Sequence, residues 1–507
     1  MTNPPVDFSD IQGIVRFGYG SLTEASFFLL RIREAEAARA WLAIAPISTA
    51  VECKTAPNTA MQVAFTADGL RALGMSEEVV EGFAPEFLSG MGQDYSRSRR
   101  LGDVGANSPE FWHWGNAEKL PHMVVMFYAR QGQLQSWIQA AQNTHWTNGF
   151  DSMDCLTTVD LDNHEPFGFT DGVSQPTLDW ERERAPGQNE IVYGNVVSLG
   201  EFLLGYPNEY GKYTDRPLLS ASDPLAKLLP QAEDAPDERD LGHNGTYVVF
   251  RQLEQNVRGF WRFANAQAPA DPQVRTAFAE SMVGRRMEGK PLVPLQASPI
   301  QGIDSKLLEQ NNFTYDADPD GIRCPFGAHV RRTNPRNPDL PGQPSNPVSK
   351  LLRMLGFGNS EFRYDVEAST RFHRLLRRGR EYGGPLLTPD QAIADSSDTQ
   401  EYGLNFICIV ANITRQFEFV QNSWLRNTKF DALTEESDPL LGDRQPITGC
   451  PLTNTFSIPQ ERGVRDRVMN VPQFITVRGG AYFFLPSLSS LRYLAALGET
   501  AEKKTSQ

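Results

Sequence analysis

The run His122-Met-Val-Val-Met-Phe-Tyr128 decides the fold, because an uninterrupted apolar stretch of this length is typical of a buried strand. A helix is expected after it, from about 132 to 143, and then a strand from Met153 to Val159. A strand over 26–32, an Ala-rich helix over 34–44 and a strand over 61–65 precede it. Two successive strand–helix–strand units are typical of a ferredoxin-like domain.

The second half of the chain repeats this order in pattern, although not in residues. Expected elements are strands over 246–250, 404–410, 474–478 and 482–485, and helices from 251 through Arg262, near 415–424, and over 487–497. We therefore expect an α+β fold with two ferredoxin-like (dimeric α/β barrel-type) domains, each with an antiparallel sheet, from a duplication. Residues 214–242 are rich in Pro, Asp and Glu and are expected to link the domains, which we place at 1–225 and 240–507.

Composition excludes several classes of protein. The 507 residues carry 48 basic and 62 acidic side chains, and the net charge of −14 argues against a nucleic-acid partner. No run reaches the roughly 18 uncharged apolar residues of a membrane span, and no secretory signal is visible. The five scattered cysteines indicate reduced thiols and a cytoplasmic protein, with non-classical release left open.

The most informative motif is Cys324-Pro-Phe-Gly-Ala-His329-Val-Arg331-Arg332-Thr-Asn-Pro-Arg336. A neutral imidazole is a good axial ligand for haem iron. Arginines two, three and seven residues after it could bind the two haem propionates. The alternative interpretation is a solvated loop, in which a histidine beside arginines has no ligand.

A second motif, Gly168-Phe-Thr-Asp171-Gly172, lies far upstream. Its glycines allow a tight turn that approaches a flat ligand closely. An aspartate in such a turn commonly caps its own backbone, and the functional alternative is an acid–base group held over a cofactor.

Together with Leu375-Leu-Arg377-Arg-Gly379, these two motifs resemble the dye-decolorising peroxidase family, and further similar segments extend the resemblance over most of the chain. The resemblance implies one haem b per chain and oxidation of dyes and phenolic or aromatic compounds by hydrogen peroxide. It also implies a high-valent ferryl intermediate, which an acidic and a basic side chain help to form. Because a carboxylate base stays ionised in acid, we expect dye oxidation to peak at acidic pH.

The resemblance also assigns residues. His329 matches the proximal iron ligand, and Asp171 and Arg377 match the distal catalytic pair. The segment Arg377-Arg-Gly-Arg-Glu-Tyr382-Gly departs from the family pattern, so Arg374 and Arg378 stay open as alternatives to Arg377. Haem contacts are further expected from Leu404 and Phe406 in the distal pocket and from Arg331 at a propionate.

Two features are left open by the sequence. The partner of the second imidazole nitrogen of His329 could be Glu418, Asp438 or Asn412, and a carboxylate there would raise ligand basicity. Tyr382 and Trp424 match surface radical sites of some relatives, but most of the 14 tyrosines and 8 tryptophans are expected in the core or at interfaces.

Rival functions remain. One is a haem-handling protein that releases iron from haem, and the other is a module that binds and carries haem. Expected partners are hydrogen peroxide and aromatic reducing substrates, with a homo-oligomer possible and neither nucleic acid nor membrane.

Overall fold

The computed structural model describes residues 4–183, 193–269, 271–336, 370–394, 399–444 and 453–498. The first half contains β1 (Glu24–Ile32), α1 (Ala35–Ile44), β2 (Thr59–Phe65), β3 (Met123–Ala129), α6 (Leu134–Ala141), α7 (Thr144–Gly149) and β4 (Phe150–Thr157). Its strands pair antiparallel in the order β2-β3-β1-β4. This is the ferredoxin-like order, as expected from the sequence.

The second half repeats the arrangement. It contains β9 (Thr246–Gln255), α8 (Val257–Gln267), β10 (Leu376–Arg377), β11 (Arg380–Tyr382), β12 (Gly403–Val410), the π-helical turns η10 (Thr414–Glu418) and η11 (Val420–Leu425), β15 (Ile475–Leu485) and α14 (Leu488–Ala496). β12 lies between β9 and the short strands β10 and β11, and β15 pairs with the other edge of β9. The prediction of two ferredoxin-like halves is therefore confirmed.

Further elements connect these two halves or extend from them. The helices are α2 (Ala67–Ala72), α3 (Glu77–Val80), α4 (Pro85–Ser89), α5 (Tyr95–Leu101), α9 (Pro272–Val283), α10 (Leu308–Asn311), α11 (His329–Thr333) and α13 (Pro389–Ile393). Small two-stranded pairs are β5 (Thr177–Leu178) with β6 (Val196–Val197), β7 (Leu218–Ser220) with β8 (Glu238–Asp240), and β13 (Phe456–Ile458) with β14 (Asp466–Val468).

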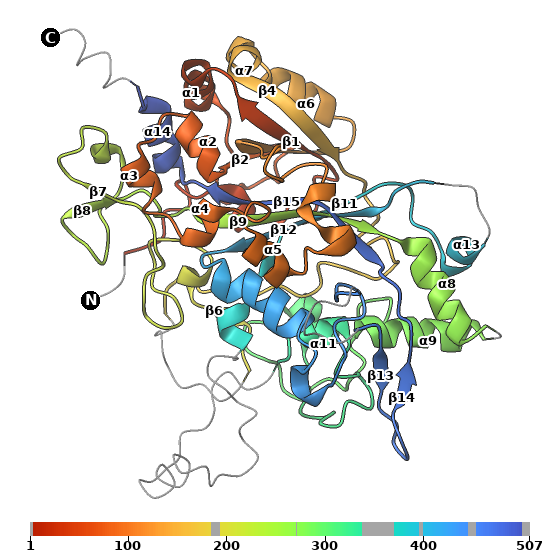
Figure 1. Cartoon of the computed structure of the whole chain (residues 1–507). Coiled ribbons are helices and arrows are strands. Elements are labelled where there is room, and N and C mark those ends of the chain that lie inside the picture. The colour runs from red at the N-terminus through yellow and green to blue at the C-terminus, as the bar shows by residue number, and fades with distance from the viewer. Residues whose placement is uncertain are drawn as a thin grey trace, which may run out of the picture.

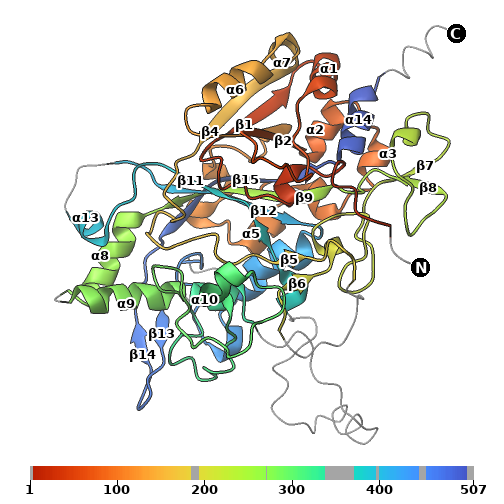
Figure 2. The ribbon, with the colours of Figure 1, turned by 180° about the vertical axis from the view of Figure 1, so that it is seen from behind.

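The two halves share one sheet. β15 meets β2 through the pair Phe484 and Phe65, so the strands run β10-β12-β9-β15-β2-β3-β1-β4. The helices α1, α6 and α7 lie at one end of the molecule, and α8, α9 and α11 lie at the other (Figures 1 and 2). The domain limits 1–225 and 240–507 stay a prediction.

The core occupies both faces of this sheet. Because side chains alternate along a strand, neighbouring residues such as Phe127 and Tyr128, or Phe483 and Phe484, enter different apolar clusters. All four of these side chains are buried. The face that carries Phe484 also carries Phe406 and Leu253, which positions it under the candidate site.

The structure differs from the expected elements at three places. Residues 251–255, expected to begin a helix, continue the strand β9, and α8 begins only at Val257. The two strands expected over 474–485 form the single strand β15, which passes Gly479 with a register shift after Val477. A Cβ on Gly479 would lie 2.6 Å from the Trp114 ring, so only glycine fits there. The expected linker 214–242 carries the β7–β8 pair, where buried Arg216 binds Asp240 at 2.6 Å.

No helix among the described residues is both long and apolar enough to cross a membrane. The Pro- and Asn-rich run 333–347 lies mostly outside the described residues.

Candidate active site

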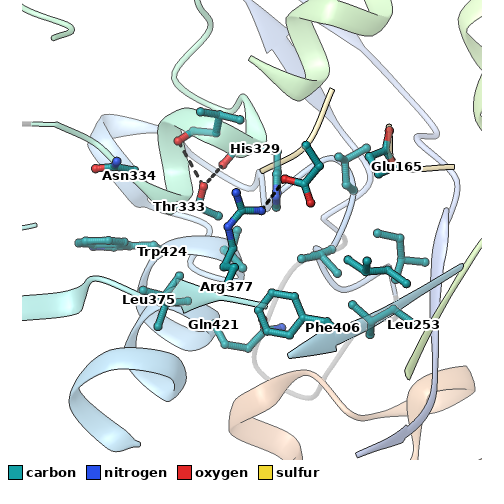
Figure 3. Close-up of a pocket in the computed structure, with 18 of the residues that line it drawn as sticks. Glu165, Leu253, His329, Thr333, Asn334, Leu375, Arg377, Phe406, Gln421 and Trp424 are labelled. Carbon is teal, nitrogen blue, oxygen red and sulfur yellow. Dashed lines mark hydrogen bonds and ion pairs between the residues drawn. The ribbon is translucent and has the colours of Figure 1, made fainter. Parts of the chain in front are cut away.

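A cavity of about 290 Å³ is lined by residues of both halves of the chain. Its floor comes from β9, β12 and β15, and its other walls come from α11, η11 and the loop around Asp171. Trp424 and Leu375 lie on one side of it, and Glu165 and Leu253 on the other (Figure 3). Of the residues that the sequence assigns, the cavity brings together His329, Asp171, Arg377, Leu404, Phe406 and Trp424.

His329 is the first residue of the short helix α11, after Ala328 with extended backbone. Its Nδ1 lies 2.9 Å from Oδ2 of Asp438, which is fully buried. The other carboxylate oxygen of Asp438 accepts hydrogen bonds from the Leu440 and Leu441 amides. Burial raises the pKa of Asp438, but His329 and the Leu441 amide outweigh it, and the pKa falls below its usual value. The carboxylate therefore fixes the proton on Nδ1 and leaves Nε2 free as a ligand.

Asp171 and Arg377 form an ion pair on the cavity wall. Arg377 Nη1 donates to Asp171 Oδ1 at 2.8 Å (Figure 3). The Gly172 amide donates to the same oxygen at 2.6 Å. Burial raises the pKa of Asp171. Arg377, the Gly172 amide and His329 together lower it by more than burial raises it, so the pKa lies below its usual value. Oδ1 accepts both of these hydrogen bonds, which leaves Oδ2 to exchange a proton.

Local backbone contacts hold this pair in place. The Gln175 side chain accepts from the Arg377 amide at 3.0 Å and donates to the Arg377 carbonyl at 3.2 Å. The chain around Asp171 needs glycine at positions 168 and 172, where the φ angles of Gly168 and Gly172 are 98° and 73°. Glu165 accepts from the Phe167 and Phe169 amides and from Gln255.

The structure separates the three arginine alternatives. Arg377 alone of them bonds Asp171. Arg378 turns away and donates to the Ile14 and Val15 carbonyls at 2.7 and 3.0 Å. Arg374 lines the cavity and donates to the Tyr193 hydroxyl and Asn195 Oδ1.

The arginines after His329 take different positions. Arg331 is not among the residues that line the cavity, and its guanidinium binds Asp318 at 3.0 Å and the Cys324 carbonyl at 2.7 Å. Arg332 also lies outside, bonded to carbonyls that include that of Trp424. Arg336 reaches the cavity wall, where its Nη atoms bind neutral oxygens of Asn311 and Phe313.

Both residues matched to radical sites are buried. Tyr382 is 9% exposed, lies outside the cavity lining and donates its hydroxyl to Glu401 at 2.8 Å. Trp424 is 5% exposed and lines the cavity, with its ring 5.2 Å from that of His373.

The other candidates for the His329 partner lie elsewhere. Glu418 forms a buried ion pair with Arg97 and accepts from Tyr482, and Asn412 accepts from the Arg415 amide.

The chain matches none of the protein-family models compared with it. A dye-decolorizing peroxidase of Mycetinis scorodonius is 28% identical over 96% of this chain and 87% of its own length. A dye-decolorizing peroxidase of Auricularia auricula-judae is 26% identical over 95% and 86%. A crystal structure of a DyP-type peroxidase from the same fungus has a TM-score of 0.70 at 25% identity, over 97% of this chain and 100% of that one. The relatives and solved structures that this chain matches over most of its length are dye-decolorizing peroxidases.

Dye-decolorizing peroxidases are haem enzymes. A solved structure of one of them, with a haem pocket engineered for asymmetric sulfoxidation, has a TM-score of 0.71 at 25% identity. The match covers 97% of this chain and all of that one. The cavity fits such a group. His329 offers Nε2, and Arg336 is a buried cation that donates to neutral oxygens of Asn311 and Phe313. Arg336 Nε and Asn334 Oδ1 are buried and have no hydrogen-bond partner among the described residues, so the cavity wall is prepared for a polar ligand.

Several residues of the candidate site were not found from the sequence. Asp438 was one of three alternatives, and nothing local marks it, because it lies 109 positions from His329. Gln175 and Glu165 were missed. Their proximity to the Asp171 motif was the available signal, since side chains beside a glycine-bounded turn commonly bond its backbone.

Proposed function

We propose that this chain is a haem b peroxidase, with one haem per chain, that reduces hydrogen peroxide and oxidises dyes and phenolic compounds. The observation that carries the proposal is that the Asp171–Arg377 pair and the Asp438-bound His329 line one cavity. His329 would hold the iron through Nε2, and Leu404 and Phe406 would lie against the distal face. Arg336, in preference to Arg331, would bind a propionate, because it lines the cavity.

The bound haem supplies the iron and the two-electron reducing capacity that cleave the O–O bond. Asp171 Oδ2 takes a proton from the inner peroxide oxygen and returns it to the outer oxygen, which leaves as water. Arg377 provides fixed positive charge where negative charge develops on the peroxide. The low pKa of Asp171 keeps it ionised in acid and ready to accept the proton. Asp438 keeps the proton of His329 on Nδ1 and makes the other nitrogen a stronger ligand.

The test is an absorption spectrum of the haem-reconstituted protein before and after one equivalent of peroxide. The expected result is a ferric haem band that changes within a second in the wild type and is abolished or shifted in His329→Ala. His145→Ala, at an exposed histidine on α7, is the matched control and should behave as the wild type. A haem band that peroxide leaves unchanged would favour haem carriage, and intact porphyrin without iron would favour iron release.

A cytoplasmic location and a homo-oligomer stay predictions. The four cysteines that the structure describes are free thiols, which supports a reducing compartment.

A further inference from the structure

One end of the cavity lies beyond Phe406 and is formed by residues that the proposed mechanism does not use. Arg251, Leu253 and Gln255 alternate along β9, so all three face the cavity. Arg251 pairs directly with Phe406 on β12, and directly opposed residues on one face of a sheet contact each other. The end is therefore adjacent to the proposed distal face of the haem.

A buried ion pair closes this end. Arg251 Nη2 donates to Oδ1 of Asp103, in the loop after α5, and the two side chains are 4% and 1% exposed. Arg251 Nε, Arg251 Nη1 and Asp103 Oδ2 have no hydrogen-bond partner among the described residues, although both side chains line the cavity. Leaving buried donors and acceptors without hydrogen bonds is unfavourable, so a ligand that satisfies them is favoured.

The charges at this end select the type of ligand. The charges of Arg251 and Asp103 cancel each other. An anionic ligand would be repelled by the Asp103 carboxylate, and a cationic ligand would be repelled by the Arg251 guanidinium. Among the described residues, Arg426 interacts electrostatically with Asp103 and Tyr482 with Arg251, and Arg426 is itself paired with Asp443 at 3.3 Å. Burial raises the pKa of Asp103 more than Arg251 and Arg426 lower it, which makes Oδ2 a strong hydrogen-bond acceptor. A neutral hydroxyl, which accepts one hydrogen bond and donates another, satisfies both sides.

The surrounding wall is apolar. Leu101 lies two positions before Asp103, and Leu253 lies two positions after Arg251 and pairs with Val477. The Phe417 ring lies 6.5 Å from that of Phe406. Apolar and aromatic side chains around a few convergent polar groups are the usual composition of a site for a small organic molecule.

We propose that this end of the cavity is a subsite for a small neutral phenol. The phenol hydroxyl accepts from Arg251 and donates to Asp103 Oδ2, and the ring lies among Leu101, Leu253 and Phe417. The inference rests on the proposed function, because it names the location in which one class of reducing substrate binds beside the haem.

The experiment is a calorimetric titration of the haem-loaded enzyme with phenol and with anisole, in the absence of peroxide. Anisole has the same ring but no hydroxyl proton, so it should bind about tenfold more weakly than phenol, as expected for the loss of one hydrogen bond to a charged group. In Asp103→Asn the amide oxygen turns to Arg251 and the amide nitrogen faces the ligand, so the preference for phenol over anisole should disappear.

Glu418→Gln is the matched control. It alters the ion pair with Arg97, which is buried to the same degree but does not line the cavity, and it should keep the preference for phenol. If Asp103→Asn fails to fold, the comparison of phenol with anisole on the wild type still decides the proposal. Equal binding of phenol and anisole by the wild type, or an unchanged preference for phenol in Asp103→Asn, would overturn the proposal. Water would then be the expected partner of Arg251 Nε, Arg251 Nη1 and Asp103 Oδ2.

This test needs no turnover, so it is separate from the proposed function. Failure of the wild type to react with peroxide would contradict the peroxidase proposal, whereas a lost phenol preference in an active enzyme would contradict only the subsite.

Discussion

At the scale of single residues, the Asp438 carboxylate controls how His329 presents itself to the cavity. In Asp438→Asn, the Leu440 and Leu441 amides retain the amide oxygen, so the NH2 group faces His329 Nδ1. Two donors then oppose each other, and the imidazole proton moves to Nε2, the nitrogen needed for iron. We expect haem affinity to fall about 10–100-fold, measured by titration of the haem-free protein.

The control for that experiment is Glu436→Gln, a buried carboxyl group two positions away that is bonded to Ser457. It should leave haem affinity unchanged. An Asp438→Asn protein with wild-type affinity would show that the tautomer of His329 is set by another group.

The low pKa of Asp171 predicts a pH profile. A depressed pKa means that the carboxylate stays ionised until the pH falls below the ordinary aspartate value of about 4. The rate of the peroxide step should therefore be flat from neutral pH to about pH 4 in stopped-flow measurements. Asp171→Asn should lower it about 10²–10⁴-fold, and the exposed control Asp160→Asn should not. An acid limb near pH 6 in the wild type would contradict this.

At the scale of elements, the turn over 165–172 depends on the charge of Glu165. Burial raises the pKa of Glu165 to about 7, against the lowering by the Phe167 and Phe169 amides and Gln255. Because the folded-state pKa lies above the ordinary value of 4.5, the resulting stabilisation is complete below pH 4.5 and is lost as the pH rises through 7.

The glutamine in Glu165→Gln has no carboxyl group to titrate, so the stability of this variant should not fall between pH 4.5 and 7 on account of residue 165. The free energy of unfolding of the wild type relative to the variant should decrease from pH 4.5 to 7, measured by urea denaturation of the haem-free protein at several pH values. Glu381, whose pKa is also raised to about 7, is present in both proteins and cancels in the difference. A difference that does not change with pH would show that Glu165 titrates outside this range.

How far the sequence predicts the elements depends on how local their causes are. The apolar run at 122–128 and the helix that follows were found because their signals lie within a few residues. The continuation of β15 through Gly479 was not predicted. Trp114 fills the space beside that glycine, and it lies far away in sequence. The assignment of Arg377 over Arg374 and Arg378 likewise required Gln175 and Asp171, two hundred positions upstream.

At the scale of the molecule, the sheet should make the two halves unfold together. Phe484 joins β15 to β2 at Phe65, is fully buried, and lies 4.8 Å from the Phe83 ring. Phe484→Ala should cost about 3–5 kcal/mol. Hydrogen exchange should then accelerate in both β3 and β12, whereas Val464→Ala, at a residue 87% exposed, should change neither. Acceleration in one strand alone would indicate independent halves.

The pairing of the two halves could not be predicted from the sequence, because it depends on contacts between residues far apart in the chain. The same reason applies to most of the site. Each half was predictable from its own alternation of strands and helices. That β15 would find β2, more than 400 positions away, depends on one contact between sheet edges that no local pattern encodes.

The position of β15 in the shared sheet also bears on how the protein is made. All other strands of that sheet precede β15 in the chain, yet β15 lies between β9 and β2. While the polypeptide emerges from the ribosome, the edges of β2 and β9 therefore stay unpaired until β15 has been synthesised. Open strand edges are templates for pairing with other chains. The nascent chain should accordingly need protection by a chaperone until late in translation.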